Sequence, residues 1–308
     1  MSASIQPQIV THDVPKRGFV AALVSSLRPR QWTKNLLVFA ALLFTLDVKH
    51  ADGDIGRSVA AFAIFCLLSG ATYIFNDLLD RDADRHHPTK KLRPIAAGQI
   101  SPAAAGFCAA VIGLGSLACA FHLSTGFGVS ALAYAILTAA YSIRLKHIVL
   151  IDVMALAAGF VIRAVAGAVV IDVRISQWLL LCTGLLALFL SIGKRRGELV
   201  AVLGGRKVGR EVIGEYSIEL LDQMSTIVTS ALVMSYALYT IQSEAAVKHP
   251  YLRVTLPFVI FGIFRYLYLI HRKNQGESPD EVVLRDHQLI ATVILWGIAT
   301  AVVILNKL

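Results

Sequence analysis

An acidic stretch followed by a basic loop runs from Tyr73 to Gly98, with the sequence YIFNDLLDRDADRHHPTKKLRPIAAG. On a helix, one face about 100° wide would collect three carboxylates, an amide and a phenol: Asp77, Asp80, Asp84, Asn76 and Tyr73. Cations follow in the loop: Arg85, Lys90, Lys91 and Arg93. Carboxylate and amide oxygens bind hard metal ions such as Mg²⁺, while Lys and Arg neutralise phosphate oxygens. The stretch therefore predicts a site for a Mg²⁺-bound diphosphate.

The composition places this site in a membrane protein. The chain has 308 residues, a mean hydropathy of +0.67 and 56% hydrophobic residues, and only 16% of its residues are charged. A soluble domain is about 25% charged. We expect an all-α polytopic helical bundle, with a polar tail over residues 1–27 and one membrane domain over 28–308. The cysteines lie in apolar runs without a CxxC spacing, which indicates small buried residues and neither a disulfide nor a zinc site.

Nine apolar runs approach the length of about 20 residues that spans a bilayer: 35–49, 57–79, 102–122, 127–144, 149–171, 176–193, 223–243, 251–271 and 288–306. With a cytoplasmic N-terminus, 21 of the 29 Lys and Arg residues fall in the inner segments. These are the tail and the loops near 80–101, 144–148, 194–222 and 272–287. The bias predicts that the N-terminus and the acidic stretch face the cytoplasm. It also accounts for the net charge of +9 without a nucleic acid partner.

Further candidates for substrate binding lie near the inner ends of the predicted spans: Lys34, Tyr141, Lys146, Asp152 and Lys194. Lys34 belongs to a basic, Trp-bearing segment (RPRQWTKN) that could instead anchor the chain at the membrane surface. Lys194 begins the run KRRGEL, for which the same alternative holds. The KRRGEL run opens the long segment 194–222, which follows the sixth predicted span and is expected to contain a surface helix or lid.

Arg163 is a charged residue within a predicted span, about 16 Å deeper than Asp152. An Arg in the membrane interior normally has an internal partner. Ala155, Gly159 and Gly167 share its helix face and would let another helix approach or leave room for a ligand. Arg163 therefore either pairs inside the bundle or binds a substrate phosphate.

The pattern NDxxDxxxD, followed by DRxHPxKxxRPIAxG, resembles the first motif of the UbiA-type intramembrane prenyltransferases. The matching residues are Asn76, Asp77, Asp80, Asp84, Arg85, His87, Pro88, Lys90, Arg93, Pro94 and Gly98. The segments RPRQWTKNLLVFAAL, YSIRLKHIVLIDV and KRRGEL resemble one branch of that family, the bacterial decaprenyl-phosphate phosphoribosyltransferases. The resemblance implies a nine-helix, UbiA-like bundle in the bacterial plasma membrane, with an active site that faces the cytoplasm.

This resemblance implies transfer of 5-phosphoribosyl from 5-phosphoribosyl 1-diphosphate (PRPP) to a long polyprenyl (decaprenyl) phosphate, which yields diphosphate and a lipid-linked phosphoribose for cell-wall arabinan synthesis. Asn76 and Asp80 would bind Mg²⁺, with Asp84 bound directly or through water and Asp77 near a ribose hydroxyl. These four residues would form the catalytic set. Substrate contacts would come from Lys34, Tyr73, Arg85, Lys90, Lys91, Arg93, Tyr141, Lys146, Asp152, Arg163 and Lys194. The acceptor phosphate is already ionised, so no catalytic His is needed, and His87 is assigned a local structural role.

Two other functions remain open. A prenyl-diphosphate transferase acting on an aromatic or quinone-precursor acceptor usually carries a second pair of acids after the fourth span. Here Asp152 stands alone, because the next acid is Asp172 at the far end of the span. An anion transporter would be expected to show paired repeats and a binding site at mid-membrane, whereas this chain shows no convincing repeat. The sequence allows a homo-oligomer but does not indicate one.

Overall fold

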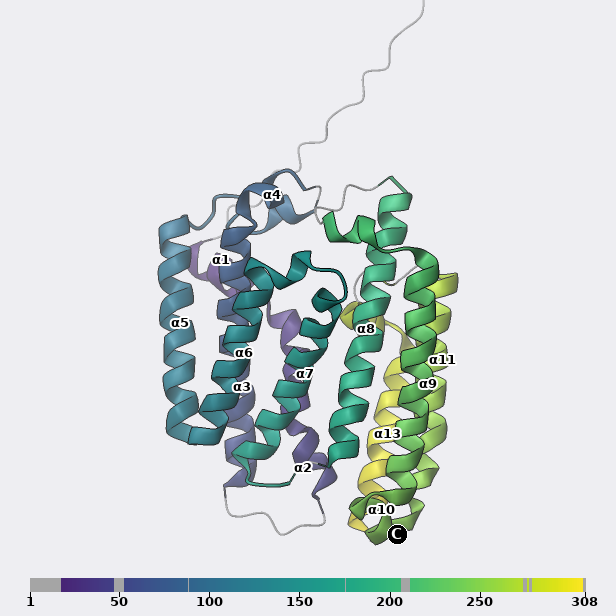
Figure 1. Cartoon of the computed structure of the whole chain (residues 1–308). Helices are drawn as coiled ribbons and strands as arrows, with labels where there is room; N and C mark the ends of the chain where they lie inside the picture. The colour runs from purple at the N-terminus through teal and green to yellow at the C-terminus, as the bar shows by residue number, and fades with distance from the viewer. Residues whose placement is uncertain are drawn as a thin grey trace, which may run out of the picture.

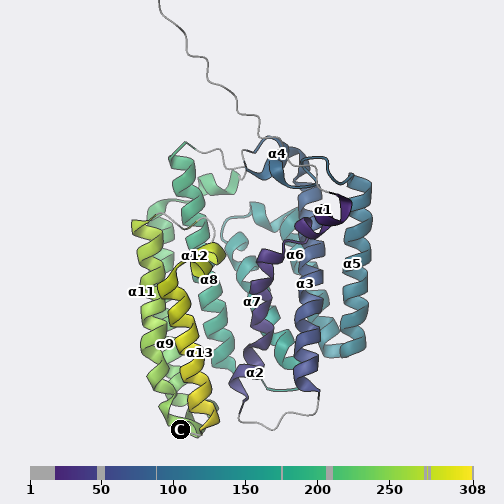
Figure 2. The same ribbon diagram turned by 180° about the vertical axis from the view of Figure 1, so that it is seen from behind.

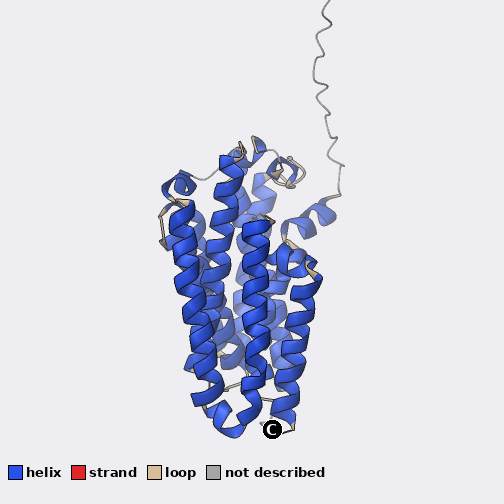
Figure 3. Cartoon of the chain, turned by 90° about the vertical axis from the view of Figure 1, so that its right-hand side faces the viewer, coloured by secondary structure: helices blue, strands red, loops and turns tan. Residues whose placement is uncertain are grey.

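The structure, a computed structural model, describes residues 18–46, 53–87, 89–174, 176–205, 211–273, 276 and 279–306. Within these ranges the regular elements are all helical, and no strand occurs (Figure 3). The all-α prediction is therefore confirmed. The expected polar tail over 1–27 lies largely outside the described residues, as does Pro88 of the motif.

Eight helical segments among the described residues are long and apolar enough to cross a membrane. They are α3 (Asp54–Leu79), α5 (Pro102–Leu123), α6 (Thr125–Ile143), α7 (Ile151–Val170), α8 (Gln177–Leu203), α9 (Ile218–Gln242), η5 with α11 (Pro250–Thr255 and Leu256–Arg272) and α13 (His287–Leu305). The shorter elements are α1 (Phe19–Ser26), η1 (Pro29–Phe39), α2 (Ala40–Phe44), α4 (Arg81–Arg85), η2 (Lys90–Leu92), η3 (Leu145–His147), η4 (Glu211–Glu215), α10 (Glu244–Lys248) and α12 (Pro279–Arg285).

The first of the nine predicted spans, 35–49, is not a continuous α-helix in its described part. It consists of the 3₁₀-helix η1 followed by the short helix α2, which together run beside α7 (Figure 2). A 3₁₀-helix rises about 2.0 Å per residue, so the sixteen residues from Pro29 to Phe44 extend about 30 Å. The nine-helix prediction thus becomes eight long helices and one broken segment, and the last residues of the predicted span lie outside the described part.

Consecutive long helices run antiparallel, so their connections gather at the two ends of the bundle. α1 and α4 lie at one end, whereas α2, α10 and the C-terminus lie at the other (Figures 1 and 2). The end with α4 also receives the connection between α6 and α7, which contains η3. Residues that are distant in the sequence therefore meet at this end, which we call the α4 end.

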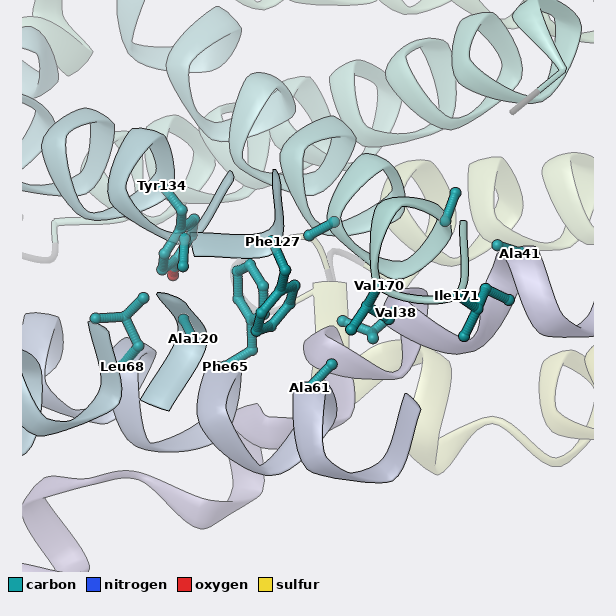
Figure 4. Close-up of a cluster of buried hydrophobic side chains, with 13 residues drawn as sticks. Val38, Ala41, Ala61, Phe65, Leu68, Ala120, Phe127, Tyr134, Val170 and Ile171 are labelled. Atoms are coloured by element: carbon teal, nitrogen blue, oxygen red, sulfur yellow. The ribbon is translucent and has the colours of Figure 1, made fainter. Parts of the chain in front are cut away.

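Of four apolar clusters among the described residues, the two with the most buried side chains hold the two halves of the bundle. The first joins η1, α3, α6 and α7, where Phe65 contacts Phe127 and Tyr134 edge-on at centroid distances of 5.7 and 5.4 Å (Figure 4). The second joins α8, α9, α11 and α13. Gly167 of α7 lies so close to the backbone of Val38 that any side chain there would collide with it. This agrees with the predicted close approach at the small-residue face of α7.

α8 continues beyond the predicted end of its span at residue 193. It runs to Leu203 and thereby takes up the KRRGEL run, which was expected to lie in a loop. Arg195 and Arg196 are consequently buried between helices instead of lying at the membrane surface. Burial of these side chains is possible because Asp152 of α7 pairs with Arg195 and Asp222 of α9 pairs with Arg196.

Candidate active site

The predicted acidic face forms at the end of α3 and continues into α4. Asp80 alone separates the two helices, and the helical hydrogen bonds run through it. The Asp80 N–H donates to the Asn76 carbonyl, and the Asp84 N–H donates to the Asp80 carbonyl. We call Asn76, Asp77, Asp80 and Asp84 the acidic cluster.

Two carboxylates of the acidic cluster are buried and bound by arginines. Arg93 Nη1 donates to Asp77 Oδ1 at 3.0 Å and to Asp84 Oδ2 at 2.6 Å. Arg28, from the connection between α1 and η1, donates to the same Asp77 oxygen, and its guanidinium lies 4.8 Å from the centroid of the Tyr73 ring. Asp77 and Asp84 thus tie the basic loop and the N-terminal segment to the end of α3. This positioning role was not part of the predictions, which gave Asp84 a metal contact and Asp77 a ribose contact.

Asp80 is the most exposed carboxylate of the cluster. Its side chain is 30% exposed, against 3% for Asp77 and 4% for Asp84. Lys146 Nζ from η3 donates to Asp80 Oδ1 at 2.6 Å, and Asn76 Nδ2 donates to Asp80 Oδ2 at 3.0 Å. The structure therefore brings the predicted residue Lys146 to the acidic cluster from 66 positions away in the sequence.

A second charged network lies where α6, α7 and α8 meet. Arg195 is fully buried and donates to Asp152 Oδ2 at 2.5 Å, to Glu198 Oε2 at 2.5 Å and to the Tyr141 hydroxyl at 3.0 Å. Asp152 is itself 0% exposed. Asp152 and Arg195 are buried as a pair, because burying either charge without the other would be costly. Asp152 therefore does not face solvent in this structure. Its predicted contact with substrate would require this pair to open.

Tyr216, between η4 and α9, connects this network to the turn that carries Lys146. Its hydroxyl donates to Asp152 Oδ1 at 2.6 Å and accepts the Leu150 N–H at 2.8 Å. Leu150 has a positive φ of 68°, a strained conformation for a residue with a branched side chain. Burial and the hydrogen bond to Asp152 raise the pKa of the Tyr216 hydroxyl, so it remains a neutral donor.

Arg163 lies deeper and is held within the bundle. It donates to Asn35 Oδ1 at 2.8 Å, to the Tyr134 hydroxyl at 2.7 Å and to the Gly159 carbonyl at 2.9 Å. Asn35 Nδ2 donates in turn to Ser69 Oγ at 3.2 Å. Arg163 is 5% exposed, so of the two predicted roles the structure favours the internal pair, which joins the broken segment η1 to α7 and α3.

The remaining predicted residues surround the acidic cluster less closely. Arg85 donates to the Ala96 carbonyl at 3.4 Å, and Lys91 is exposed. Lys34, Lys90 and Lys194 are partly exposed. His87 accepts the backbone N–H groups of Thr89 and Lys90 at 3.3 Å through Nδ1, which supports its predicted structural role. Partial burial and nearby Lys90 lower the pKa of His87 and so favour the neutral imidazole that can accept these bonds.

The donor set fits a metal ion that is carried by a substrate better than a metal held by the protein alone. Among the described residues, no three His, Cys, Asp or Glu side chains gather as a metal cage. Mg²⁺ commonly uses one or two protein carboxylates and completes its coordination with phosphate and water. Asp80 meets that need, and Asn76 lies beside it, whereas the carboxylates of Asp77 and Asp84 are held by arginine.

Comparison with known proteins assigns the family. Residues 29–284 match the sequence profile of the UbiA prenyltransferase family. The chain belongs to this family. Decaprenyl-phosphate phosphoribosyltransferases from Mycolicibacterium smegmatis and Corynebacterium glutamicum are both 34% identical to the chain and cover 92% of it, which is 92% and 86% of their own lengths. A UbiA homologue from Archaeoglobus fulgidus, solved with GPP and Mg²⁺, superposes with a TM-score of 0.68 at 21% identity and covers 93% of this chain and 98% of its own.

Several residues of this UbiA-family site were not predicted. Arg28, Asn35 and Tyr216 received no individual role, and Arg195 was considered only as one cation of the KRRGEL run. Each is joined to its partner across 43 to 128 positions of sequence. A signal was available for Arg195, since a charged residue at the end of an apolar run requires either the membrane surface or a buried acid.

Proposed function

We propose that this UbiA-family protein transfers the 5-phosphoribosyl group of PRPP to the phosphate of a long polyprenyl phosphate. The observation that carries the proposal is the 34% identity, over 92% of the chain, to several decaprenyl-phosphate phosphoribosyltransferases. The acidic cluster and its cations are also the groups that a metal-bound diphosphate requires. The products would be diphosphate and polyprenylphosphoryl-5-phosphoribose, a precursor for cell-wall arabinan.

In the proposed reaction, the bond between ribose C1 and a diphosphate oxygen breaks as a lipid phosphate oxygen bonds to C1. The main demands are neutralisation of the departing diphosphate and positioning of the two phosphates. Asn76 and Asp80 would hold Mg²⁺, which when bound supplies positive charge to the departing oxygens. Lys146 is already at 2.6 Å from Asp80 and would donate to a phosphate placed beside that carboxylate.

The acceptor requires no protein base, because a phosphate monoester is ionised at neutral pH. The arginines of the cluster would instead set the shape of the site. Arg93 holds two buried carboxylates and so fixes the basic loop that carries Lys90 and Lys91. The proposed orientation places this α4 end at the cytoplasmic face of the bacterial plasma membrane, where PRPP is present.

The runner-up reaction, prenyl transfer to an aromatic acceptor, receives less support from the second network. A second acidic motif would need open carboxylates near the start of α7. Asp152 occupies that place, but both of its oxygens accept hydrogen bonds, from Arg195 and Tyr216. Asp152 therefore joins α7 to α8 and to Tyr216, and neither of its oxygens is left without a hydrogen bond.

The proposal is tested with purified protein in lipid nanodiscs, radiolabelled PRPP and decaprenyl phosphate. We expect a labelled lipid product that forms with Mg²⁺ and is lost with EDTA, together with release of one diphosphate per lipid formed. Geranyl diphosphate with an aromatic acceptor serves as the competing substrate pair. Turnover of that pair without turnover of PRPP would overturn the proposal in favour of prenyl transfer.

A further inference from the structure

A cavity of about 650 Å³ lies at the end of the bundle opposite the acidic cluster. Its walls come from α2, α7, the connection that enters α8, the end of α9, and α10. α2 and α10 both lie at this end, far from α4 (Figures 1 and 2). No residue of the acidic cluster lines it. The proposed transfer reaction therefore gives this cavity no role.

The lining is divided between aromatic and charged side chains. Phe44, Trp178 and Tyr239 supply the aromatic surface. Phe44 and Tyr239 meet edge-on at a centroid distance of 5.9 Å, which makes this wall part of the packed core. The cavity reaches inwards to Ala164 of α7. Along the helix axis, Ala164 lies about 9 Å from the helix end at Val170. The aromatic wall therefore extends inwards, towards the depth of the lipid chains.

The charged side chains lie in the segments that end the spans. Arg174 and Lys248 are exposed, and neither forms an ion pair with any described residue. His249 also lines the cavity, and Glu244 is the acid among the lining residues. Two permanent cations against one carboxylate leave the lining positive. Cations at the level where spans end meet lipid headgroups, and anionic headgroups attract them.

We propose that this cavity binds an anionic phospholipid from the leaflet at this end of the protein. Its phosphate would lie between Arg174 and Lys248, and the first part of its chains would lie against Phe44 and Trp178. The volume fits this occupant, since sites for small molecules measure about 300–1,000 Å³. Free phosphate shares the headgroup chemistry, but it would leave the aromatic wall unused. The wall therefore favours a lipid over a soluble anion.

The test compares lipid binding by native mass spectrometry of the full-length protein, titrated with phosphatidylglycerol or phosphatidylcholine. The variant R174Q/K248Q removes both cations of the lining. We expect it to bind phosphatidylglycerol about 30-fold more weakly, since each surface Lys or Arg contributes about fivefold. Arg253→Gln is the matched control, because Arg253 is exposed at the same end on η5 but does not line the cavity. It should bind phosphatidylglycerol as the unmodified protein does.

The outcomes separate the possible occupants. Equal phosphatidylglycerol affinities for R174Q/K248Q and Arg253→Gln, at unchanged melting temperatures, would overturn the proposal. A parallel titration with glycerol 1-phosphate identifies the part of the lipid that is recognised. Displacement of phosphatidylglycerol at equal concentrations of glycerol 1-phosphate would assign the cavity to soluble phosphates and also overturn it. Equal retention of phosphatidylcholine and phosphatidylglycerol would show that the charge plays no part.

Discussion

At the scale of single residues, the four members of the acidic cluster share one helical face but differ in exposure and in hydrogen-bond partners. Asp77 and Asp84 are buried and bound to arginine, whereas Asp80 keeps nearly a third of its side chain exposed. A carboxylate that must receive an incoming metal-bound diphosphate has to remain accessible. The structure thus separates one carboxylate that can meet the substrate from two that shape the site around it.

Asp80→Asn is expected to lower phosphoribosyl transfer on the order of 100-fold, because it removes the one accessible carboxylate while it keeps the side-chain volume. Initial rates with labelled PRPP in nanodiscs measure the effect. Asp82→Asn is the matched control, since Asp82 lies only two residues further along, in α4, but its side chain is 86% exposed and points to Arg85. Equal activity of the two variants would exclude Asp80 as a required ligand.

Tyr216→Phe tests the link between the buried network and the turn at Leu150. Loss of the hydroxyl leaves the Leu150 N–H and one oxygen of Asp152 without their partner, which should cost about 1–3 kcal/mol of stability. Thermal unfolding in detergent, followed by circular dichroism, measures the loss. Tyr251→Phe is the control, because Tyr251 is 52% exposed at the opposite end of the bundle. A melting temperature equal to that of the control would contradict the proposed link.

At the scale of elements, the segment η1–α2 is not one continuous α-helix, yet part of its backbone packs closely against α7. Its backbone contacts the small-residue face of α7, and Asn35 at its centre accepts a hydrogen bond from Arg163. Within a membrane, packing against small residues and hydrogen bonds between segments replace the hydrophobic effect as the source of association. The segment is therefore fixed by α7 and α3 more than by its own helix propensity.

Gly167→Ala is expected to disrupt this packing, because the new methyl group would collide with the Val38 carbonyl of η1. We expect a loss of at least about 2 kcal/mol in stability, since backbone cannot move aside as a flexible side chain can. Gly113→Ala on α5 is the matched control, where the added carbon would meet Ala71 Cβ at an ordinary 3.6 Å. Thermal melts of both variants in one detergent decide the matter. Equal stability would show that η1 is not held by this contact.

These elements also show what a sequence can and cannot predict. Hydropathy located eight of the nine spans, because an apolar run of about 20 residues has few alternatives to a membrane helix. At 35–49 it could not predict the broken form of the described segment, because that geometry depends on packing against Gly167, more than a hundred positions away. The helical period likewise placed Asn76 and Asp80 on one face. It could not reveal Arg28 or Tyr216, because their roles exist only once distant helices have packed.

At the scale of the whole molecule, the bundle separates its charges between two ends. The acidic cluster, the basic loop and the Arg195 network all lie at the α4 end, and the described chain enters at that end and leaves at the other (Figure 1). The count of Lys and Arg in the sequence predicts that the α4 end faces the cytoplasm. This orientation matters for the proposed reaction, because PRPP is made in the cytoplasm and cannot cross a bilayer unaided.

The orientation is tested by cysteine labelling in whole cells, in a background where the four native cysteines are replaced by alanine. Asp82→Cys places a thiol on α4, and Tyr251→Cys places one on η5 at the opposite end. An impermeant maleimide should label the Tyr251→Cys protein in intact cells and the Asp82→Cys protein only after the cells are permeabilised. Because both side chains are exposed, a lack of reaction in intact cells reports the side of the membrane and not burial. Labelling of Asp82→Cys in intact cells would place the acidic cluster outside, where PRPP cannot reach it, and would contradict the proposed reaction as well as the orientation.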